Sequence, residues 1–263
     1  NGGCVNEQWR KGVRIAKGDF IWIAESDDVA TPDFLQVLLQ QFKSFPEIGM
    51  AYCDSMIIDD AGIELGGYDY SHSEYQNRWQ GDFVLDGKTF IKEHLVFRNV
   101  IPNASAVVFR KENLKAALSE SNMKYCADYQ CYTRLLSNAA IAYVSKPLNF
   151  FRAHIHTTRW HSQQSYAAAA KEKITILKEI KRLNIPQSTE NLVKSCRWLF
   201  KHRHRQIIDK KSSVADKKGI PIKTLSTSLL ADIDVVVVCS FNFKEEMCSN
   251  LNKQGFKGRV ITV

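Results

Sequence analysis

The feature that most constrains this fold is a short, almost wholly apolar stretch, Asp19–Ala24 (DFIWIA), that runs directly into carboxylates. Gly18 precedes the stretch, and Glu25, Asp27 and Asp28 follow it. A continuous apolar run bounded by turn residues is typical of a buried strand in a mixed or parallel sheet. Carboxylates gathered at the end of such a strand are costly unless a positive charge lies nearby. We therefore expect a buried strand whose carboxyl end meets a cationic ligand.

Strand-like and helix-like patterns alternate through the first part of the chain, which predicts an α/β fold with a Rossmann-like mixed sheet and flanking helices. Further strands are expected at Gly49–Asp54, Ala104–Phe109 and Ala140–Val144. Helices are expected from Thr31 and Pro32, as N-cap and first helical residue, to Pro46, and at about Asp86–Phe97, Glu112–Ser119 and Asp128–Asn138. Between these elements, Asp59–Gly62 is a turn signal. The segment Glu64–Phe83 is rich in Gly, Tyr and polar residues, which predicts a long loop.

After Arg159 the character of the sequence changes. A helix is expected at Tyr166–Leu183, and a second, basic helix at about Glu190–Lys210. From Asp232 the pattern is strand, helix, strand, which is the start of a second Rossmann-like βαβ unit. The chain is therefore expected to have three parts: 1–160, a basic helical segment and linker at 161–230, and the βαβ unit at 231–263.

The formal net charge of +8 is concentrated between Lys171 and Lys223. Such a run is either a solvated helix face or a surface that attracts an anionic membrane or nucleic acid. The sequence has no nucleic-acid motif, zinc-ligand spacing or ladder of aromatic and basic residues, so we expect no nucleic-acid partner. The seven cysteines are odd in number and form no Cys-x-x-Cys pair, which favours a reducing compartment.

Two interpretations of the acidic cluster follow from the residues alone. Ligands of open α/β sheets bind beyond the carboxyl ends of the strands, and Mg²⁺ or Mn²⁺ takes oxygen ligands together with substrate phosphates. The cluster would then hold a divalent cation and a diphosphate. Alternatively, Glu25, Asp27 and Asp28 only cap the following turn and helix.

The wider context of the acidic cluster resembles the family 2 glycosyltransferases of the GT-A fold. That family carries Asn-x-Gly, a basic or aromatic turn, and an A-x-G-(D/E) strand ending in an S-D-D motif, followed by a Leu- and Phe-rich helix. Here the matching segments are NGG…QWRKGVRIAKGDFIWIAESDD and PDFLQVLLQQF, and later blocks resemble the family as far as Arg159. The resemblance implies a metal-dependent transfer of a sugar from a nucleotide diphosphate sugar.

On the donor side, the resemblance implies that Asp28 binds the metal and that Asp27 supports the ribose or the metal shell. Glu25 stands where many members have Asp. Trp9 occupies the usual position of an arginine, so Arg10 or Lys11 is expected to contact the phosphates instead.

In the block CADYQCYTRLL, the resemblance implies that Asp128 is the general base that accepts the proton of the acceptor hydroxyl. An aspartate here is also favoured by the helix dipole, so both roles remain open. Asn103 and Tyr129 are expected to contact the acceptor. In the closing block FFRAHIHTTR, Arg152 is expected to meet the diphosphate and His154 the metal.

The wording of the motifs is similar to bacterial enzymes of cell-surface polysaccharide assembly. The implied acceptor is a hydroxyl of a glycan or lipid-linked glycan, the implied stereochemistry is inversion, and the implied location is cytoplasmic, with contact to the inner face of the plasma membrane. The family pattern is entered midway, so a nucleotide-binding half is expected before residue 1. The rival hypotheses are a sugar nucleotidyltransferase and a non-catalytic binding domain of glycan assembly.

Overall fold

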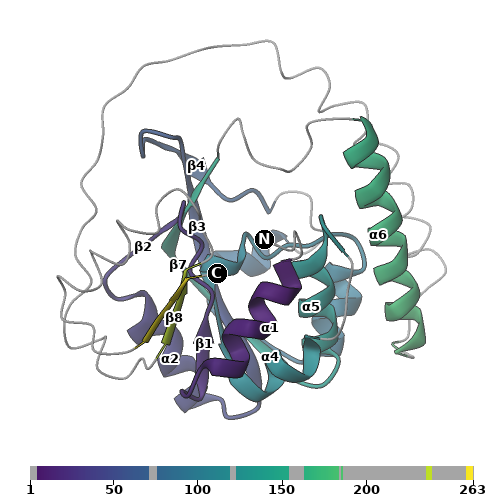
Figure 1. Ribbon diagram of the computed structural model, residues 1–263, viewed down its shortest axis with the longest axis horizontal. Coiled ribbons are helices and arrows are strands. Elements are labelled where there is room, and N and C mark those ends of the chain that lie inside the picture. Colours follow the sequence, from purple (N-terminus) through teal and green to yellow (C-terminus); the bar gives the residue numbers. More distant parts are fainter. Residues whose placement is uncertain are drawn as a thin grey trace.

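The computed structural model describes residues 5–70, 76–118, 123–153, 163–183 and 185, and two strands at 235–238 and 259–262. The chain folds into a curled mixed sheet with helices on both faces (Figure 1). This architecture is mixed α/β and Rossmann-like, as the alternation of patterns predicts.

Seven strands form the main sheet. Five follow the order β1 (Phe20–Trp22), β6 (Val107–Arg110), β3 (Ile48–Ile58), β7 (Ala140–Arg152) and β2 (Val29–Ala30). In addition, β4 (Glu64–Gly67) pairs with β3, and β5 (Phe83–Leu85) pairs with β7. The pairing of β3 with β7 is parallel, and the other pairings in this sheet are antiparallel.

The topology brings the functional candidates to one edge of the sheet. Because β6 is antiparallel to both β1 and β3, its start lies beside the carboxyl end of β1 and beside Tyr52 of β3, which continues to Ile58. The parallel strand β7 ends at this same edge. The segments that follow β1, precede β6 and close β7 are therefore neighbours, although they lie far apart in the sequence.

Successive residues of each strand point to opposite faces of the sheet, as strand geometry requires. On β3, Met50 and Tyr52 belong to one buried cluster, and Ala51 and Cys53 belong to the other. Helix α2 (Phe34–Ser44) covers the second face. The first face carries α1 (Val5–Ile15), α4 (Lys111–Ala117) and α5 (Ala127–Leu136) (Figure 1).

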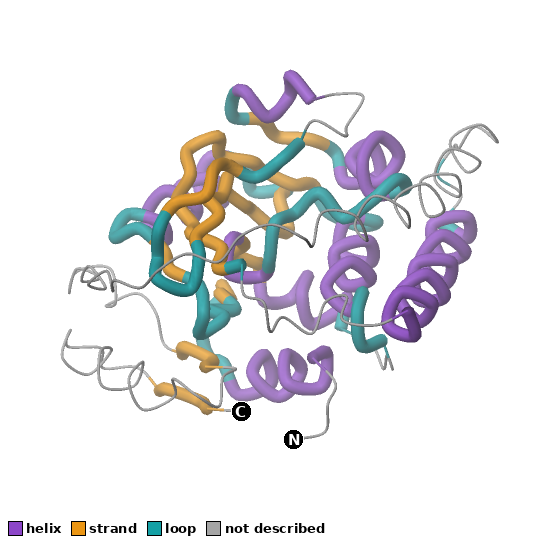
Figure 2. The backbone as a smooth tube through the Cα atoms, turned by 90° about the horizontal axis from the view of Figure 1, so that it is seen from above, coloured by secondary structure: helices purple, strands orange, loops and turns teal. Residues whose placement is uncertain are grey.

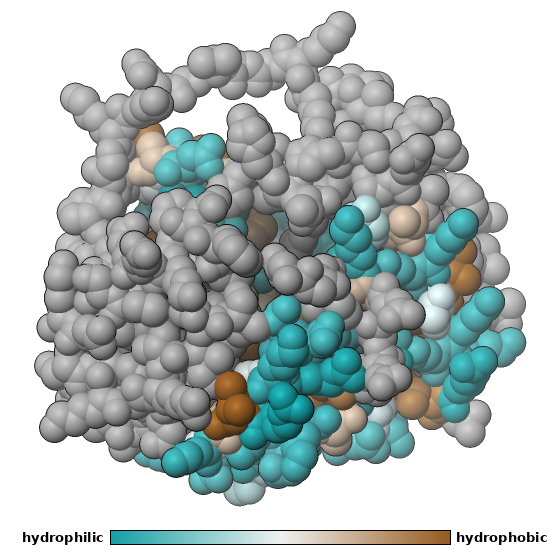
Figure 3. All heavy atoms as spheres, viewed as in Figure 1, coloured by the Kyte–Doolittle hydropathy of each residue, from teal (hydrophilic) through white to brown (hydrophobic). Residues whose placement is uncertain are grey.

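The long helix α6 (Gln163–Arg182) packs on the outside of α5, away from the sheet, in both Figure 1 and Figure 2. Its Ile176 and Ile180 are fully buried, which explains why this helix is held against the first part of the chain. On the face drawn in Figure 3, the described residues where α6 lies are mostly hydrophilic, with small hydrophobic spots. Among the residues that the structure describes, no helix is both long enough and apolar enough to cross a membrane.

The helix predicted at Asp86–Phe97 is present but irregular. Asp86 caps it by accepting a hydrogen bond from the Thr89 amide at 2.9 Å. The α-helical turn α3 (Gly87–Phe90) then widens into a π-helical turn, η2 (Ile91–Leu95).

Several predicted boundaries are wrong. The expected loop at Glu64–Phe83 contains β4 and a 3₁₀ helix, η1 (Gln76–Gln80). Because β4 is exposed throughout, its sequence has no alternation of apolar and polar residues that would predict a strand. Residues Ala104–Ala106 form a 3₁₀ turn, η3, before β6 begins. The N-cap of α2 is Asp33 rather than Thr31, and the helix starts at Phe34.

Strand β7 is much longer than the predicted Ala140–Val144. Proline rarely occurs inside a paired strand because it has no N–H to donate, so Pro147 favours an early end of the strand. The structure accommodates Pro147 through shifts of register beside Asp54, after which pairing with β3 resumes at Ser55 and Asn149. The extension matters because it carries Asn149 and Arg152 to the functional edge.

In the remaining part of the chain, β8 (Val235–Val238) and β9 (Arg259–Thr262) form a parallel pair, which confirms the two strands predicted there. The helix predicted between them and the basic helix predicted at about 190–210 lie outside the described residues.

Candidate functional site

Asp28 lies at the carboxyl end of β1, where its carboxylate is held from two sides. The side-chain amide of Asn103 donates to its Oδ2, and the backbone N–H of Arg152 donates to its Oδ1 at 2.9 Å. These donors come from the segment before β6 and from the last residue of β7. The three segments that the topology brings together therefore converge on the one carboxylate that the resemblance singled out as the metal ligand.

A buried polar network fixes the orientation of Asn103. Its Oδ1 accepts hydrogen bonds from the Ala106 amide at 3.0 Å and from Nδ2 of Asn149 at 3.1 Å. Asn149 also donates to Oγ of Ser55 at 2.9 Å. Asn103, Asn149 and Ser55 are all fully buried. Buried polar groups that bond to one another in this way specify a single arrangement of side chains, although Oδ1 of Asn149 has no partner among the described residues.

The expectation that Asn103 contacts the acceptor needs correction. Its side chain has no exposed surface, and both ends of its amide are engaged within the protein. Asn103 is therefore a residue that orients Asp28, and it cannot reach a bound ligand without leaving this network.

The turn between β1 and Asp28 is anchored on Ser105. Its Oγ accepts from the Glu25 amide at 2.9 Å, and its carbonyl accepts from Nε1 of Trp22 at 2.9 Å. Within the turn, the Asp28 amide donates to the Glu25 carbonyl at 3.3 Å. These contacts place Glu25, Asp27 and Asp28 in one compact, half-buried turn.

Arg152 supplies a positive charge beside this acidic turn. Its guanidinium donates to the Asp27 carbonyl at 2.8 Å and to the Asp59 carbonyl at 2.6 Å. The side chain therefore ties the acidic turn to the turn between β3 and β4. A carboxylate cluster at a strand end needs a nearby positive charge, and Arg152 supplies part of that charge. Its predicted contact with a diphosphate stays a prediction.

Asp128 lies in the first turn of α5 and is half-buried. Nδ2 of Asn99 donates to its Oδ2 at 3.1 Å, and Oδ1 of Asn99 accepts from the Ile101 amide at 3.1 Å. Asn99 and Asn103 are four residues apart, so their Cα atoms lie within about 14 Å of each other. One short segment thus places an asparagine on each of the two predicted site carboxylates.

Tyr129, expected to contact the acceptor, faces the core instead. Only 4% of it is exposed, and its hydroxyl donates to the Leu95 carbonyl. Burial raises the pKa of its phenol far above the usual range. Successive residues of a helix point about 100° apart, so Tyr129 turns inward where Asp128 does not.

The two residues of α1 that are predicted to contact the phosphates, Arg10 and Lys11, lie in different environments. Lys11 is exposed and pairs with Glu7 at 3.7 Å, and Arg10 is half-buried. Trp9, which occupies the family's usual arginine position, is a core residue with 4% exposure. The phosphate roles of Arg10 and Lys11 stay predictions.

His154 lies outside the described residues. Within the ranges that are described, no group of three or more His, Cys, Asp or Glu side chains is arranged to hold a metal ion. Mg²⁺, however, is commonly bound through one or two carboxylates together with substrate phosphates. Asp28 fits that kind of site because hydrogen bonds from Asn103 and from the Arg152 amide orient its carboxylate, as is usual for ligating carboxylates.

Sequence reasoning missed the residues that orient the two carboxylates, Asn99, Asn149 and Ser55. A signal for Asn149 was present, because an asparagine between apolar residues in PLNFF must find a buried partner. For Asn99 and Ser55, the sequence offered no comparable signal.

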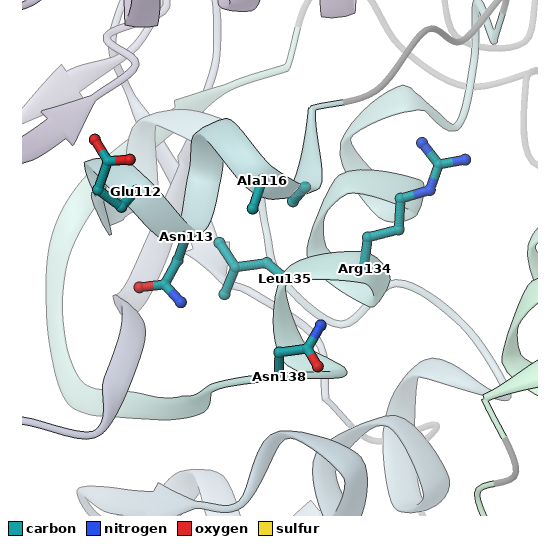
Figure 4. Close-up of a pocket in the computed structure, with 7 residues that line it drawn as sticks. Glu112, Asn113, Ala116, Arg134, Leu135 and Asn138 are labelled. Carbon is teal, nitrogen blue, oxygen red and sulfur yellow. The ribbon is translucent and has the colours of Figure 1, made fainter.

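A cavity of about 200 Å³ lies between α4 and α5 and is lined mainly by these two helices. Figure 4 shows Glu112 and Arg134 on opposite sides of it. Arg134 is already paired with Glu179 at 2.8 Å, and Glu112 pairs with Lys115 at 3.6 Å. Because no set of reactive side chains converges there, the candidate site is the acidic edge of the sheet.

A scan against models of known protein families finds no match to the chain, and a search of curated proteins finds none either. The motifs and the geometry of the acidic edge are therefore the observations that bear on function.

Proposed function

We propose that the chain is a glycosyltransferase of the GT-A fold, similar to family 2, in which the described residues form the metal and acceptor side. It transfers a sugar from a nucleotide diphosphate sugar to a hydroxyl of a glycan or lipid-linked acceptor, with inversion. The observation that carries the proposal is the segment Asn99–Asn103, which holds Asp28 at one end and Asp128 at the other.

Each carboxylate has a separate task in this reaction. Asp28, together with the donor diphosphate, would hold Mg²⁺ or Mn²⁺, which stabilises the negative charge of the leaving diphosphate. Asp128 accepts the proton of the acceptor hydroxyl as that oxygen attacks the anomeric carbon. Arg152 adds a positive charge on the diphosphate side of the edge.

The arrangement of the sheet supports the same assignment. Both carboxylates lie at or near the edge where β1, β3 and β7 end, and ligands of open α/β sheets bind at such edges. A GT-A domain with a bacterial surface-polysaccharide role accounts for the motifs, for the buried network around Asp28 and for a base on α5.

Contact with an anionic membrane surface is part of the proposal. From residue 168 onward, where the side chains of α6 are described, the exposed positions are mainly basic, and Glu172 and Glu179 turn inward to bind the protein. The exposed basic residues of this helix are Lys171, Lys178, Lys181 and Arg182. Basic residues near an anionic bilayer contribute about 1 kcal/mol each to binding.

The test compares Asp28→Asn with Asp19→Asn, since Asp19 is exposed at the opposite end of β1. Sugar transfer is measured against Mn²⁺ concentration with a panel of nucleotide diphosphate sugars. Asp28→Asn should abolish the metal-dependent rate, and Asp19→Asn should match wild type. Equal metal-dependent rates in all three proteins would remove Asp28 from the metal site.

The products separate the rival functions. Transfer releases a nucleoside diphosphate, whereas a nucleotidyltransferase forms pyrophosphate from a nucleoside triphosphate and a sugar phosphate. Donor binding without either product would favour the non-catalytic binding domain.

A further inference from the structure

Two adjacent residues of α6 hold the two backbone segments that carry Asn99 and Asp128. Glu172 and Lys173 lie outside the part of the chain where the family resemblance placed the site. Their contacts nevertheless reach residues that lie two to four positions before the proposed general base and two positions before its partner.

Glu172 binds the backbone immediately before α5. Its Oε1 accepts from the Lys124 amide at 2.8 Å, and its Oε2 accepts from the Tyr125 and Cys126 amides, each at 2.9 Å. Three consecutive N–H groups thus point at one carboxylate. Cys126 is the N-cap residue of α5 and the other two residues precede it, so none of the three amides belongs to the hydrogen-bond ladder of that helix. Asp128 follows two residues later, so Glu172 fixes the position at which Asp128 enters the site.

Lys173 binds the segment that carries the partner asparagine. It is 5% exposed, and its ammonium donates to the Phe97 carbonyl, two residues before Asn99. Glu172 and Lys173 lie about 100° apart around α6, so they can reach two different segments from one helical turn. The hydrogen bond from Asn99 to Asp128, 3.1 Å long, joins those same two segments.

We infer that Glu172 and Lys173 are positioning residues for sugar transfer, acting as a clamp that holds Asn99 and Asp128 in register. This inference rests on the proposed role of Asp128 as general base. Neither residue touches the substrate; each acts through the backbone that it holds. Helix α6 is then a required part of the acceptor side, and its covering of α5 is more than packing.

A second contact between α6 and α5 provides a matched control. Glu179 accepts from Arg134 at 2.8 Å and from Gln130 at 2.6 Å, both on α5. Glu179 lies seven residues, or two helical turns, beyond Glu172, and its partners are past the first turn of α5. Removing it weakens the same pair of helices without touching the backbone around Asp128.

The experiment measures kcat and donor KM in the whole chain for Glu172→Ala, Glu172→Gln, Lys173→Met and the control Glu179→Gln. We expect kcat to fall by about 10- to 100-fold in Glu172→Ala and Lys173→Met, the scale of a small misplacement of a reacting group. Donor KM should stay within about twofold, because the donor binds on the Asp28 side. Glu172→Gln keeps one acceptor oxygen and should recover part of the rate. Glu179→Gln should keep the wild-type kcat.

Hydrogen exchange tests the clamp without any activity. The amides of residues 124–126 should exchange faster in Glu172→Ala, and the Ile101 amide, which reports on Asn99, should exchange faster in Lys173→Met. An equal loss of kcat in Glu179→Gln would show a general effect of helix docking and overturn the inference. Wild-type kcat in Glu172→Ala, despite faster exchange at 124–126, would also overturn it. A wild-type protein that transfers no sugar would instead overturn the proposed function, and with it any catalytic use of the clamp.

Discussion

Asn103 donates a hydrogen bond to Asp28 across 75 residues of sequence. Asn103 is fully buried, and the Asp28 carboxylate is half-buried at the end of β1. A carboxylate that must bind a metal in one orientation benefits from such a donor, because ligand orientation is set by the hydrogen bonds behind it.

Replacing Asn103 by alanine should both destabilise the fold and weaken the metal-dependent rate. The change removes the acceptor of the Ala106 amide and one of the two acceptors of the Asn149 amide, and an unsatisfied buried group costs about 1–3 kcal/mol. We expect a loss of roughly 2–4 kcal/mol in urea denaturation. Asn77→Ala, at an exposed position, is the control. An unchanged denaturation midpoint in Asn103→Ala would contradict the network.

Asp128→Asn should lower kcat by about 10²–10⁴-fold, the usual range for losing a general base. The amide cannot accept the proton of the acceptor hydroxyl, although it keeps the size of the side chain. Donor affinity, measured by calorimetry, should hardly change, because the proposed function places the donor on the Asp28 side. Loss of donor binding in this variant would move Asp128 away from the acceptor.

The sequence predicted a strand before the acids because its apolar run and its carboxylates are local signals. It was wrong that this strand is buried, because β1 is a three-residue edge strand on which Phe20 is exposed. It could not predict that β7 continues to Arg152, because Pro147 is a local argument for stopping and the register shift beside Asp54 is a tertiary event. The site residues divide in the same way between local signals and tertiary contacts. Asp28 and Asp128 were identified from motifs, whereas Asn99 and Glu172 became visible only when segments distant in sequence were brought together.

Tyr129 shows the limit of reading a motif without its helix. In the sequence, both residues of the motif looked equally functional. In the structure, only its neighbour Asp128 is half-buried and bonded to Asn99. The side-chain directions of α5 separate them, and those directions depend on which face of α5 meets the core.

Gly87→Ala should destabilise the protein, although glycine-to-alanine changes in helices usually stabilise by about 1 kcal/mol. A Cβ at Gly87 would stand 2.0 Å from the Ala139 carbonyl oxygen and 2.1 Å from that of Leu136. Backbone atoms cannot move aside cheaply, and overpacking typically costs about 1–3 kcal/mol or more. Gly81→Ala, whose Cβ would meet nothing within 4 Å, is the control for thermal unfolding. A higher melting temperature in Gly87→Ala would show that α3 does not approach the end of α5 so closely.

The last prediction concerns His94, which is 1% exposed between Phe90 and Trp79. Arg78 stands 3.0 Å from its Nε2, and since arginine can only donate, Nε2 accepts and the imidazole is neutral. Glu93 lies 4.0 Å from the same nitrogen but is paired with Arg78. Burial, aided by the Arg78 guanidinium, lowers the pKa of His94 from 6.5 to about 3.

The sign of the pH effect follows from this shift. Between pH 6.5 and about 3 the unfolded chain binds a proton at His94 and the folded chain does not. The free energy of unfolding should therefore fall by about 1.4 kcal/mol for each pH unit of acidification in that window. The variant His94→Gln cannot bind the proton, so the contribution of His94 to the pH dependence of the unfolding free energy should vanish. Urea denaturation of both proteins at pH 8, 6 and 5 measures the difference, and the pH 8 pair sets the baseline. Parallel pH profiles for wild type and His94→Gln would mean that the folded protein protonates His94 as readily as the unfolded chain does.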